Sequence, residues 1–186
     1  MIRKQAFMHY SDQPMKDYIK MVYDLAPKKT DTAGSSSGDE YNSRFSNVSW
    51  IENSIVSKKL FDYLWILIND ANQNGKYNFD LQFIEPLQFT EYSVEQKYDW
   101  HVDQLIDRQD EHVRKLSFTC LLNSDFEGGE LELECGSPSN PNRIHAVDLK
   151  AGDIVFFPSY TWHRVKPVTK GIRHSLVGWI QGPEWR

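Results

Sequence analysis

Two histidines and one aspartate are the residues whose types and spacing best suit a metal centre. His101 and Asp103 stand two positions apart, and His163 lies in a separate stretch, 162–165, that is predicted to be a strand. Residues two apart on a strand face the same side, so His101 and Asp103 can bind one ion from one strand end. Two imidazoles and one carboxylate leave coordination positions open on ferrous iron, and zinc accepts the same ligands.

One arginine indicates what those open positions would serve. Arg173 follows His163 by ten residues, on a stretch, 172–180, whose alternation predicts a strand with Arg173 on its inner face. An inward arginine is costly unless an anion meets it, and a guanidinium binds a carboxylate in bidentate fashion. We therefore expect 2-oxoglutarate as a cosubstrate. We also expect a turn at 169–171 that pairs this strand with the one carrying His163.

Other polar side chains need the same scrutiny. Tyr92, nine residues before His101, is placed to add a hydroxyl to the cosubstrate carboxylate or to pack in the core. The remaining histidines lack neighbours of metal-ligand type and are expected at the surface or in hydrogen bonds: His9, His112, His145 and His174.

Composition and charge limit the class of protein. The chain has 186 residues, 40% hydrophobic and 25% charged, which fits one globular domain over 1–186. The net charge of −5 makes nucleic acid an unlikely partner, although Arg164, Lys166 and Lys170 offer a local basic patch. No apolar run is long enough to span a membrane. Cys120 and Cys135 are expected as free thiols in a reducing cytoplasm.

Two amphipathic helices are expected before residue 79. Apolar residues recur at three- and four-residue steps over 14–26 and again over 55–72, with Pro27 and Gly75 just beyond. Residues 28–40 are polar, small and aperiodic, which predicts a mobile loop or, more sharply, a lid near an active site. We expect residues 1–78 to form a helical layer that supports the strands after it.

After residue 78 the hydrophobic period becomes that of strands. Alternation runs over 81–92, with Pro86 at an edge or bulge. Further short strands are expected at 115–122, 130–134, 144–149, 153–157, 161–166 and 172–180, separated by turn signals. Helices first and many short strands later favour a mainly β fold with supporting helices, a barrel or cupin-like jelly roll over 79–183.

Several longer motifs follow one another in this part of the chain. They are YSVEQKYDWHVD (92–103), RKLSFTCLLN (114–123), FEGGELEL (126–133), LKAGDIVFFPS (149–159) and WHRVKPVTKGIR (162–173). With them the chain resembles the prolyl-4-hydroxylase-like branch of the 2-oxoglutarate/Fe(II) dioxygenases, especially the bacterial PKHD-type hydroxylases and their phage-encoded relatives. The resemblance covers residues 81–183 and, more weakly, 44–51.

This resemblance implies roles for particular residues. It implies a double-stranded β-helix with iron on His101, Asp103 and His163. Arg173 would bind the distal carboxylate of 2-oxoglutarate, where animal and plant prolyl hydroxylases often carry lysine. Tyr92 stands at the family's cosubstrate tyrosine. In contrast, Leu121 or Leu122 stands where some relatives place a second one.

The implied reaction is the hydroxylation of a prolyl residue in a peptide or protein. It consumes dioxygen and 2-oxoglutarate, gives succinate and carbon dioxide, and uses ascorbate as reductant, in the cytoplasm of a bacterium or of a phage-infected host. Two alternatives stay open: the same iron chemistry on a free amino acid, another side chain or nucleic acid, and a non-oxidative cupin-like metal protein. Tyr98, Trp100 and Trp179 are expected either at the substrate mouth or in the core.

Overall fold

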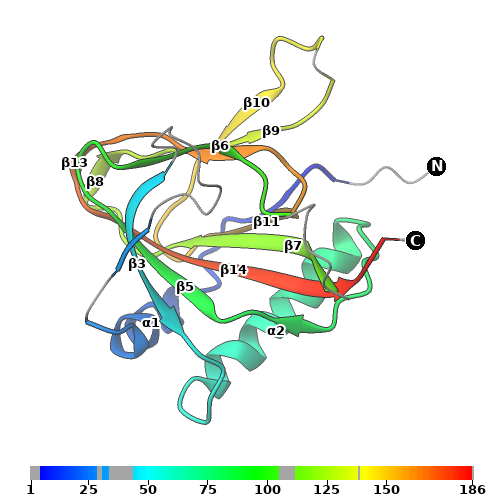
Figure 1. The fold of residues 1–186 in the computed structure, drawn as a ribbon, viewed down its shortest axis with the longest axis horizontal. Coiled ribbons are helices and arrows are strands. Elements are labelled where there is room, and N and C mark those ends of the chain that lie inside the picture. The colour runs from blue at the N-terminus through cyan, green and yellow to red at the C-terminus, as the bar shows by residue number, and fades with distance from the viewer. Residues whose placement is uncertain (1–4, 29–30, 34–43, 105–111, 138, 186) are drawn as a thin grey trace.

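The protein is a mainly β structure in which a strongly curled antiparallel sheet is backed by two helices (Figure 1). The computed structural model describes residues 5–28, 31–33, 44–104, 112–137 and 139–185. Strands pair in the order β1 (Met8–Tyr10), β11 (Ile154–Pro158), β7 (His112–Leu121), β14 (Arg173–Pro183), β5 (Leu87–Tyr92), β3 (Arg44–Ile51), β6 (Lys97–His101), β12 (His163–Val165), β9 (Leu131–Glu134) and β10 (Ile144–Val147).

The strand β3 makes the sheet fold over on itself. Its first residues, Arg44 and Phe45, pair with β6, whereas residues 47–51 pair with β5. The sheet therefore has a major layer (β1, β11, β7, β14, β5 and most of β3) and a minor layer (β6, β12, β9 and β10). Apolar side chains fill the space within this curl and form an inner core: Tyr92, Leu131, Leu133, Val147, Val155, Phe157, Val165 and Val168.

The two helices cover the outer face of the major layer (Figure 1). They are α1 (Ile19–Leu25), preceded by a 3-10 turn at Lys16–Tyr18, and α2 (Lys58–Asn74). Helix α2 starts three residues later than predicted because the hydroxyl of Ser57 donates to the carbonyl of Glu52 and accepts from the amide of Ser54, which makes a turn there. It ends at Gly75, as the sequence predicted.

Residues 1–78 were expected to form a helical layer with a loop at 28–40, but they also contribute strands. Strands β1 and β3 lie in this part of the chain, and β2 (Asp31–Ala33) pairs with β3 inside the segment 28–40 that was predicted as a loop. The rest of that loop lies outside the described residues. Strand β3 was missed because Ser46 and Ser49 occupy buried positions and hide the alternation of apolar residues.

The expected pairing of the last strand was also wrong. Strand β14 pairs with β5, β7 and the short β4 (Phe83–Ile84), whereas β12 pairs with β6 and β9. The predicted turn at 169–171 is part of β13 (Val168–Gly171), which pairs with β8 (Phe126–Gly128) and carries the chain between the layers. At Gly171 the backbones meet so closely that a Cβ atom would lie 2.4 Å from the Asp125 carbonyl oxygen. Arg173 therefore faces His163 from the opposite layer.

We expect much of the fold's stability to come from the outer core, the apolar cluster between the two helices and the major layer. Leu64 of α2 is fully buried there, and Leu64→Ala should lower the free energy of unfolding by about 2–5 kcal/mol, since it removes apolar contacts and leaves a cavity. Ile66, two residues away, is exposed, and Ile66→Ala should stay within roughly 0.5 kcal/mol of wild type. Urea denaturation measures both, and equal losses would contradict the assignment of α2's buried face.

Candidate metal and cosubstrate site

The two histidines of the predicted triad meet across a strand pair in the minor layer. His101 is the last residue of β6 and His163 the first of β12, and the two are direct partners in the antiparallel ladder. Asp103 follows in the turn after β6, where its backbone amide donates to the carbonyl of Ser159 at 2.9 Å. One loop contact and one strand pairing thus bring together residues that are 62 positions apart in the sequence.

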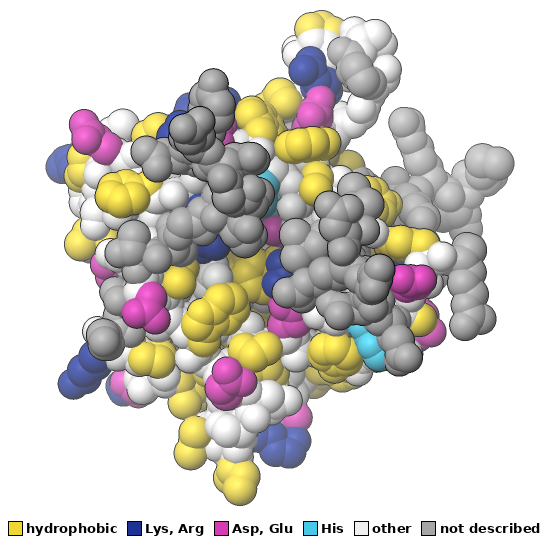
Figure 2. Space-filling model, in the orientation of Figure 1, with side chains coloured by type: hydrophobic (Ala, Val, Ile, Leu, Met, Phe, Trp, Pro, Cys, Tyr) yellow, Lys and Arg dark blue, Asp and Glu magenta, His cyan; other side chains and the backbone are white. Residues whose placement is uncertain are grey.

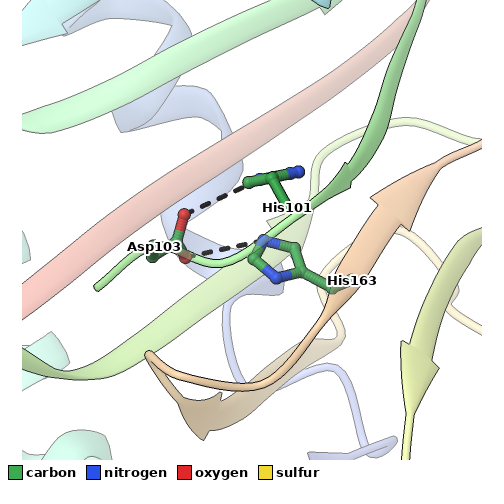
Figure 3. A group of neighbouring side chains, drawn as sticks. All are labelled: His101, Asp103 and His163. Carbon is green, nitrogen blue, oxygen red and sulfur yellow. Dashed lines mark ion pairs between the residues drawn. The ribbon is translucent and has the colours of Figure 1, made fainter. Parts of the chain in front are cut away.

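The three side chains converge on one point (Figure 3). His101 Nε2 lies 3.7 Å from one carboxylate oxygen of Asp103, and His163 Nε2 lies 3.5 Å from the other. Ligand atoms of all three residues lie within 4.8 Å of one another, the only such group of His, Cys, Asp and Glu among the described residues. The donor set fits a divalent metal ion, and it is the set that ferrous oxygenase sites use.

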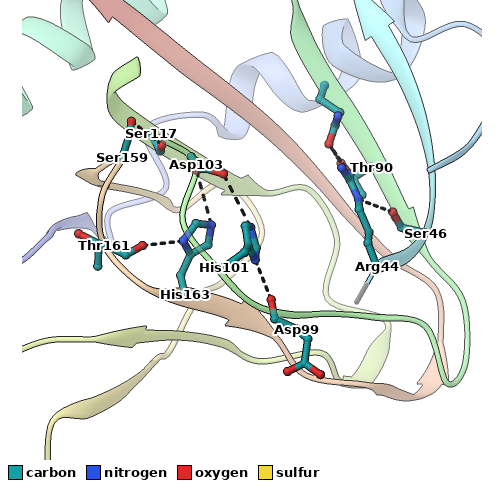
Figure 4. A network of polar contacts seen from close by, with 11 residues as sticks. Arg44, Ser46, Thr90, Asp99, His101, Asp103, Ser117, Ser159, Thr161 and His163 are labelled. Atoms are coloured by element: carbon teal, nitrogen blue, oxygen red, sulfur yellow. Dashed lines mark hydrogen bonds and ion pairs between the residues drawn. The ribbon is translucent and has the colours of Figure 1, made fainter. Parts of the chain in front are cut away.

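Backbone carbonyls orient both imidazole rings (Figure 4). His101 Nδ1 bonds to the Asp99 carbonyl at 2.7 Å, and His163 Nδ1 bonds to the Thr161 carbonyl at 2.9 Å. Each carbonyl accepts a hydrogen bond from the protonated Nδ1, which leaves Nε2 with a free lone pair facing Asp103. The rings are therefore held in the tautomer that a metal needs.

Electrostatics keep two of the three triad residues in their metal-binding protonation state. Burial, with a smaller contribution from the neighbouring His163, lowers the pKa of His101 to about 3. Burial alone would raise the pKa of Asp103, but the two histidines and a hydrogen bond from Ser117 outweigh it and bring that pKa below its usual value. Ser117 is itself fixed by Ser159, with 2.9 Å between the two hydroxyl oxygens.

Arg173 lies in the same pocket as a buried cation. It is 2% exposed, and its Nη1 donates to Ser175 Oγ at 3.0 Å. Burial lowers the pKa of its guanidinium, and no described carboxylate forms an ion pair with it. Tyr92 is its cross-strand partner on β5, with the ring centroid 5.8 Å from the guanidinium carbon. A buried cation of this kind fits a site for an anionic ligand.

A glycine makes room for this arginine. A Cβ atom on Gly129 would lie 2.9 Å from Cδ of Arg173, and the residue has a φ of +65°, which side chains rarely adopt. Gly129 was predicted only as part of a turn before β9. In the structure it also sets how closely the chain approaches the stem of Arg173.

The pocket also contains residues that the sequence did not single out. Two of them, Arg44 and Gln88, come from β3 and β5 and lie beside Tyr98. Tyr98 and Trp179 line the pocket, as one of the two expectations had it. Trp100 lies outside it, under the guanidinium of Arg164. The lining residues are Arg44, Gln88, Tyr92, Tyr98, His101, Asp103, Phe118, Thr119, Leu131, Phe157, His163, Val165, Arg173, Ser175, Val177 and Trp179.

Leu121 or Leu122 stands where some relatives place a second cosubstrate tyrosine, and the two side chains lie in different surroundings. Leu122 packs in the outer core, whereas Leu121 lines a second cavity of about 310 Å³ on the other side of Arg173. That cavity shares Arg173 and Leu131 with the triad pocket but contains no histidine. The chemistry therefore belongs to the triad pocket.

The other histidines lie elsewhere, as expected. His112 bonds to Gln82, and His174 bonds to Tyr23 and faces Glu91. His145 contacts the ring of Phe7, and His9 lies 3.5 Å from Asp153.

Two further expectations concern the whole chain. Cys120 and Cys135 are both free thiols, as predicted. In the part of the chain that the structure describes, no helix combines the length and the apolar character needed to cross a membrane.

Fold and site together define a class of protein: a jelly roll with a two-histidine, one-carboxylate metal site and a buried arginine in the same pocket. The family model of the 2OG-Fe(II) oxygenase superfamily matches residues 87–181, just over half of the sequence. The chain belongs to this superfamily.

The related sequences are PKHD-type hydroxylases. One from Synechococcus sp. (strain JA-2-3B'a(2-13)) is 36% identical over 94 residues, which is 48% of this chain and 40% of that protein. One from Idiomarina loihiensis is 48% identical over 68 residues, or 36% of this chain and 29% of that protein. The chain thus matches less than half the length of these relatives.

Solved structures agree on the fold over nearly the whole chain. A Pseudomonas putida prolyl-4-hydroxylase matches with a TM-score of 0.72 at 20% identity, covering 97% of this chain and 94% of that one. The viral collagen prolyl hydroxylase of Paramecium Bursaria Chlorella virus-1, solved with 2OG, gives 0.71 at 18% identity, covering 96% and 97%. At these identities the likeness shows the fold, the double-stranded β-helix.

The low pKa of His101 predicts an acid sensitivity of the metal-free protein. As the pH falls below 6.5, the ordinary pKa of histidine, the unfolded chain takes up a proton that folded His101 refuses until about pH 3, so the free energy of unfolding falls. By pH 5 this linkage amounts to about 2 kcal/mol. Asp103 adds to this loss of stability only when the pH falls below 3.8, the ordinary pKa of aspartate, because its pKa in the folded protein is lower.

Urea denaturation at pH 7 and pH 5, in the presence of a chelator, measures this effect. We expect His101→Asn to lose less stability than wild type over the same interval, with the other histidines common to both proteins. An equal loss in the two proteins would show that His101 is not held neutral by burial.

Proposed function

We propose that this protein is an Fe(II)- and 2-oxoglutarate-dependent oxygenase that hydroxylates a prolyl residue in a peptide or protein and releases succinate and carbon dioxide. The observation that carries the proposal is one pocket that joins the triad to a buried arginine without an acidic partner. Three ligands on one side leave positions for two cosubstrate oxygens and dioxygen. Arg173 and the family match argue against a non-oxidative zinc cupin, and titration with 2-oxoglutarate discriminates between the two.

Each residue has a distinct role in this proposal. Ferrous iron, when bound, supplies dioxygen activation coupled to oxidative decarboxylation of 2-oxoglutarate. His101, His163 and Asp103 would hold it, with His101 kept neutral by burial and with both rings oriented by the carbonyl partners of their Nδ1 atoms. Arg173 would fix the distal carboxylate of the cosubstrate with Tyr92 beside it. Their burial excludes water from the reacting groups.

Prolyl residues are the proposed target because structures of the same fold are titled prolyl hydroxylases, among them the Pseudomonas putida and viral proteins. The sequence relatives are named PKHD-type hydroxylases, which supports hydroxylation as the reaction. A free amino acid or another side chain remains the second candidate for the same site.

The surface gives nucleic acid little support as a substrate. The three basic residues of the expected patch are each paired with a glutamate: Arg164 with Glu132, Lys166 with Glu130 and Lys170 with Glu127. Figure 2 shows acidic and basic side chains interspersed on the face drawn. Paired charges of this kind lose most of their attraction for phosphate.

Removing a proposed metal ligand should abolish turnover. We expect His163→Ala to reduce succinate formation to background with Fe(II), 2-oxoglutarate, ascorbate and proline-containing peptides, and to abolish the gain of one oxygen atom measured by mass spectrometry. His112→Ala, which alters a histidine bonded to Gln82 away from the pocket, is the matched control and should turn over as wild type does. Equal turnover in His163→Ala and wild type would rule out the triad.

Removing the proposed anchor should affect cosubstrate binding specifically. Arg173→Ala should raise the concentration of 2-oxoglutarate needed for half-maximal turnover roughly 10- to 100-fold, the usual worth of a charged hydrogen bond, with the iron requirement little changed. Arg143→Ala serves as the control, because Arg143 lies outside the pocket and forms an ion pair with Glu134 at the end of β9. The rise in unfolding temperature that 2-oxoglutarate causes measures the same affinity without turnover. An unchanged cosubstrate requirement would refute the role of Arg173.

A further inference from the structure

A second arginine, Arg44, lines the triad pocket and is not used by the proposed reaction. It is the first residue of β3 and the cross-strand partner of Tyr98. Its Nε donates to Ser46 Oγ at 3.1 Å, and its Nη2 donates to the amide oxygen of Gln88 (Figure 4). These partners are neutral, so they orient the guanidinium without cancelling its charge.

The described arginines divide into two groups. Outside the pocket, Arg114, Arg143 and Arg164 each form a close ion pair with a glutamate: Glu85, Glu134 and Glu132. Inside the pocket, Arg44 and Arg173 form no ion pair with any described carboxylate. Among the described residues, the arginines outside the pocket are thus neutralised, and the two that line it are not.

Arg44 lies close to the proposed metal centre. Its guanidinium carbon is 4.8 Å from the centroid of the Tyr98 ring, and that ring stacks on the imidazole of His101 with centroids 3.5 Å apart. The guanidinium is therefore one aromatic ring removed from a proposed metal ligand. Since neighbouring residues of a peptide are about 3.8 Å apart, a group bound to Arg44 lies within one or two residues of an oxidised carbon.

When the site is loaded, the charges of the other groups cancel and the charge of Arg44 remains without a counter-ion. A ferrous ion, the Asp103 carboxylate, dianionic 2-oxoglutarate and the Arg173 cation together carry no net charge. A further guanidinium in a part-buried pocket is stabilised by a further anion, and a carboxylate matches its planar fork. Dioxygen is neutral, so the reacting substrate is the remaining ligand of this site that could supply this anion.

We propose that Arg44 binds a carboxylate of the substrate and so selects substrates that carry one within one or two residues of the carbon to be hydroxylated. This inference rests on the proposed function. Two sources have the same chemistry: an acidic side chain beside the target residue of a peptide, and the α-carboxylate of a free amino acid. Arg44 is a specificity-determining residue, because it touches the substrate away from the reacting atoms.

The test compares acids with their amides. Four probes are used: a blocked proline peptide with an adjacent glutamate, the same peptide with glutamine, free L-proline, and L-prolinamide. Binding is measured by calorimetry to protein loaded with zinc and 2-oxoglutarate, a combination that is redox-inert and consumes no probe. Wild type should bind at least one acid at least 10-fold more tightly than its amide, and the acid that shows the preference identifies the source.

Arg44→Gln should abolish this preference and leave amide binding unchanged, whereas Arg44→Lys should restore part of it because it keeps the charge. Arg143→Gln, which removes a surface arginine, is the matched control and should behave as wild type. The proposal is overturned if wild type does not distinguish acid from amide, or if Arg44→Gln keeps the preference. It is also overturned if Arg44→Gln weakens the binding of 2-oxoglutarate instead, since Arg44 would then be a cosubstrate anchor.

Turnover with iron, run in parallel on wild type, keeps this result separate from the proposed function. No succinate formation with any probe or peptide overturns the oxygenase proposal. The acid-to-amide comparison in the zinc-loaded protein does not depend on that reaction and still decides the role of Arg44.

Discussion

The antiparallel pairing of β6 with β12 is the constraint on which the site depends. It sets His101 directly opposite His163, so both imidazoles enter the curl of the sheet at the same height. A slip of one residue in this register would turn one histidine to the outer face, because strand side chains alternate. The ladder continues from β12 to β9, where His163 also lies opposite the buried Leu133, and this second pairing fixes the register from the other side.

The interior holds an unusual balance of charge. In the triad pocket, the groups with formal charge are the Asp103 carboxylate and the guanidinium groups of Arg44 and Arg173, and neither arginine has an acidic partner among the described residues. Such an arrangement costs stability in the ligand-free protein, because buried cations lose their hydration. Anionic ligands would offset this cost when they bind. The described arginines outside the pocket differ, because each forms an ion pair with a glutamate.

The site needs both layers of the sheet. The minor layer supplies His101 and His163, and the major layer supplies Arg173 and Tyr92 from the adjacent strands β14 and β5. The proposed metal ligands and the proposed cosubstrate anchor therefore approach the pocket from opposite sides. The crossing strand β13, with β8 beside it, sets the length of chain between His163 and Arg173 and so fixes how these two sides face each other.

Local patterns predicted a good part of this protein from sequence. The helices, the break at Pro86, the spacing of His101 and Asp103, and the inward face of Arg173 all depend on periodicity and on residue types over short stretches. The pairing of β14 was predicted wrongly, and β13 occupies the stretch that was predicted as a turn. Arg44 was missed altogether, because the strand that carries it has serines at buried positions.

The sequence by itself determined which residues have the chemistry to bind a metal and an anion, since donor atoms and charge belong to side chains. Only the tertiary structure decided which of them meet. Whether His163 faces His101, whether Arg173 comes from the opposite layer and whether Arg44 keeps an uncancelled charge all depend on contacts between distant segments. Those contacts are set by sheet register and burial, which no short stretch of sequence contains.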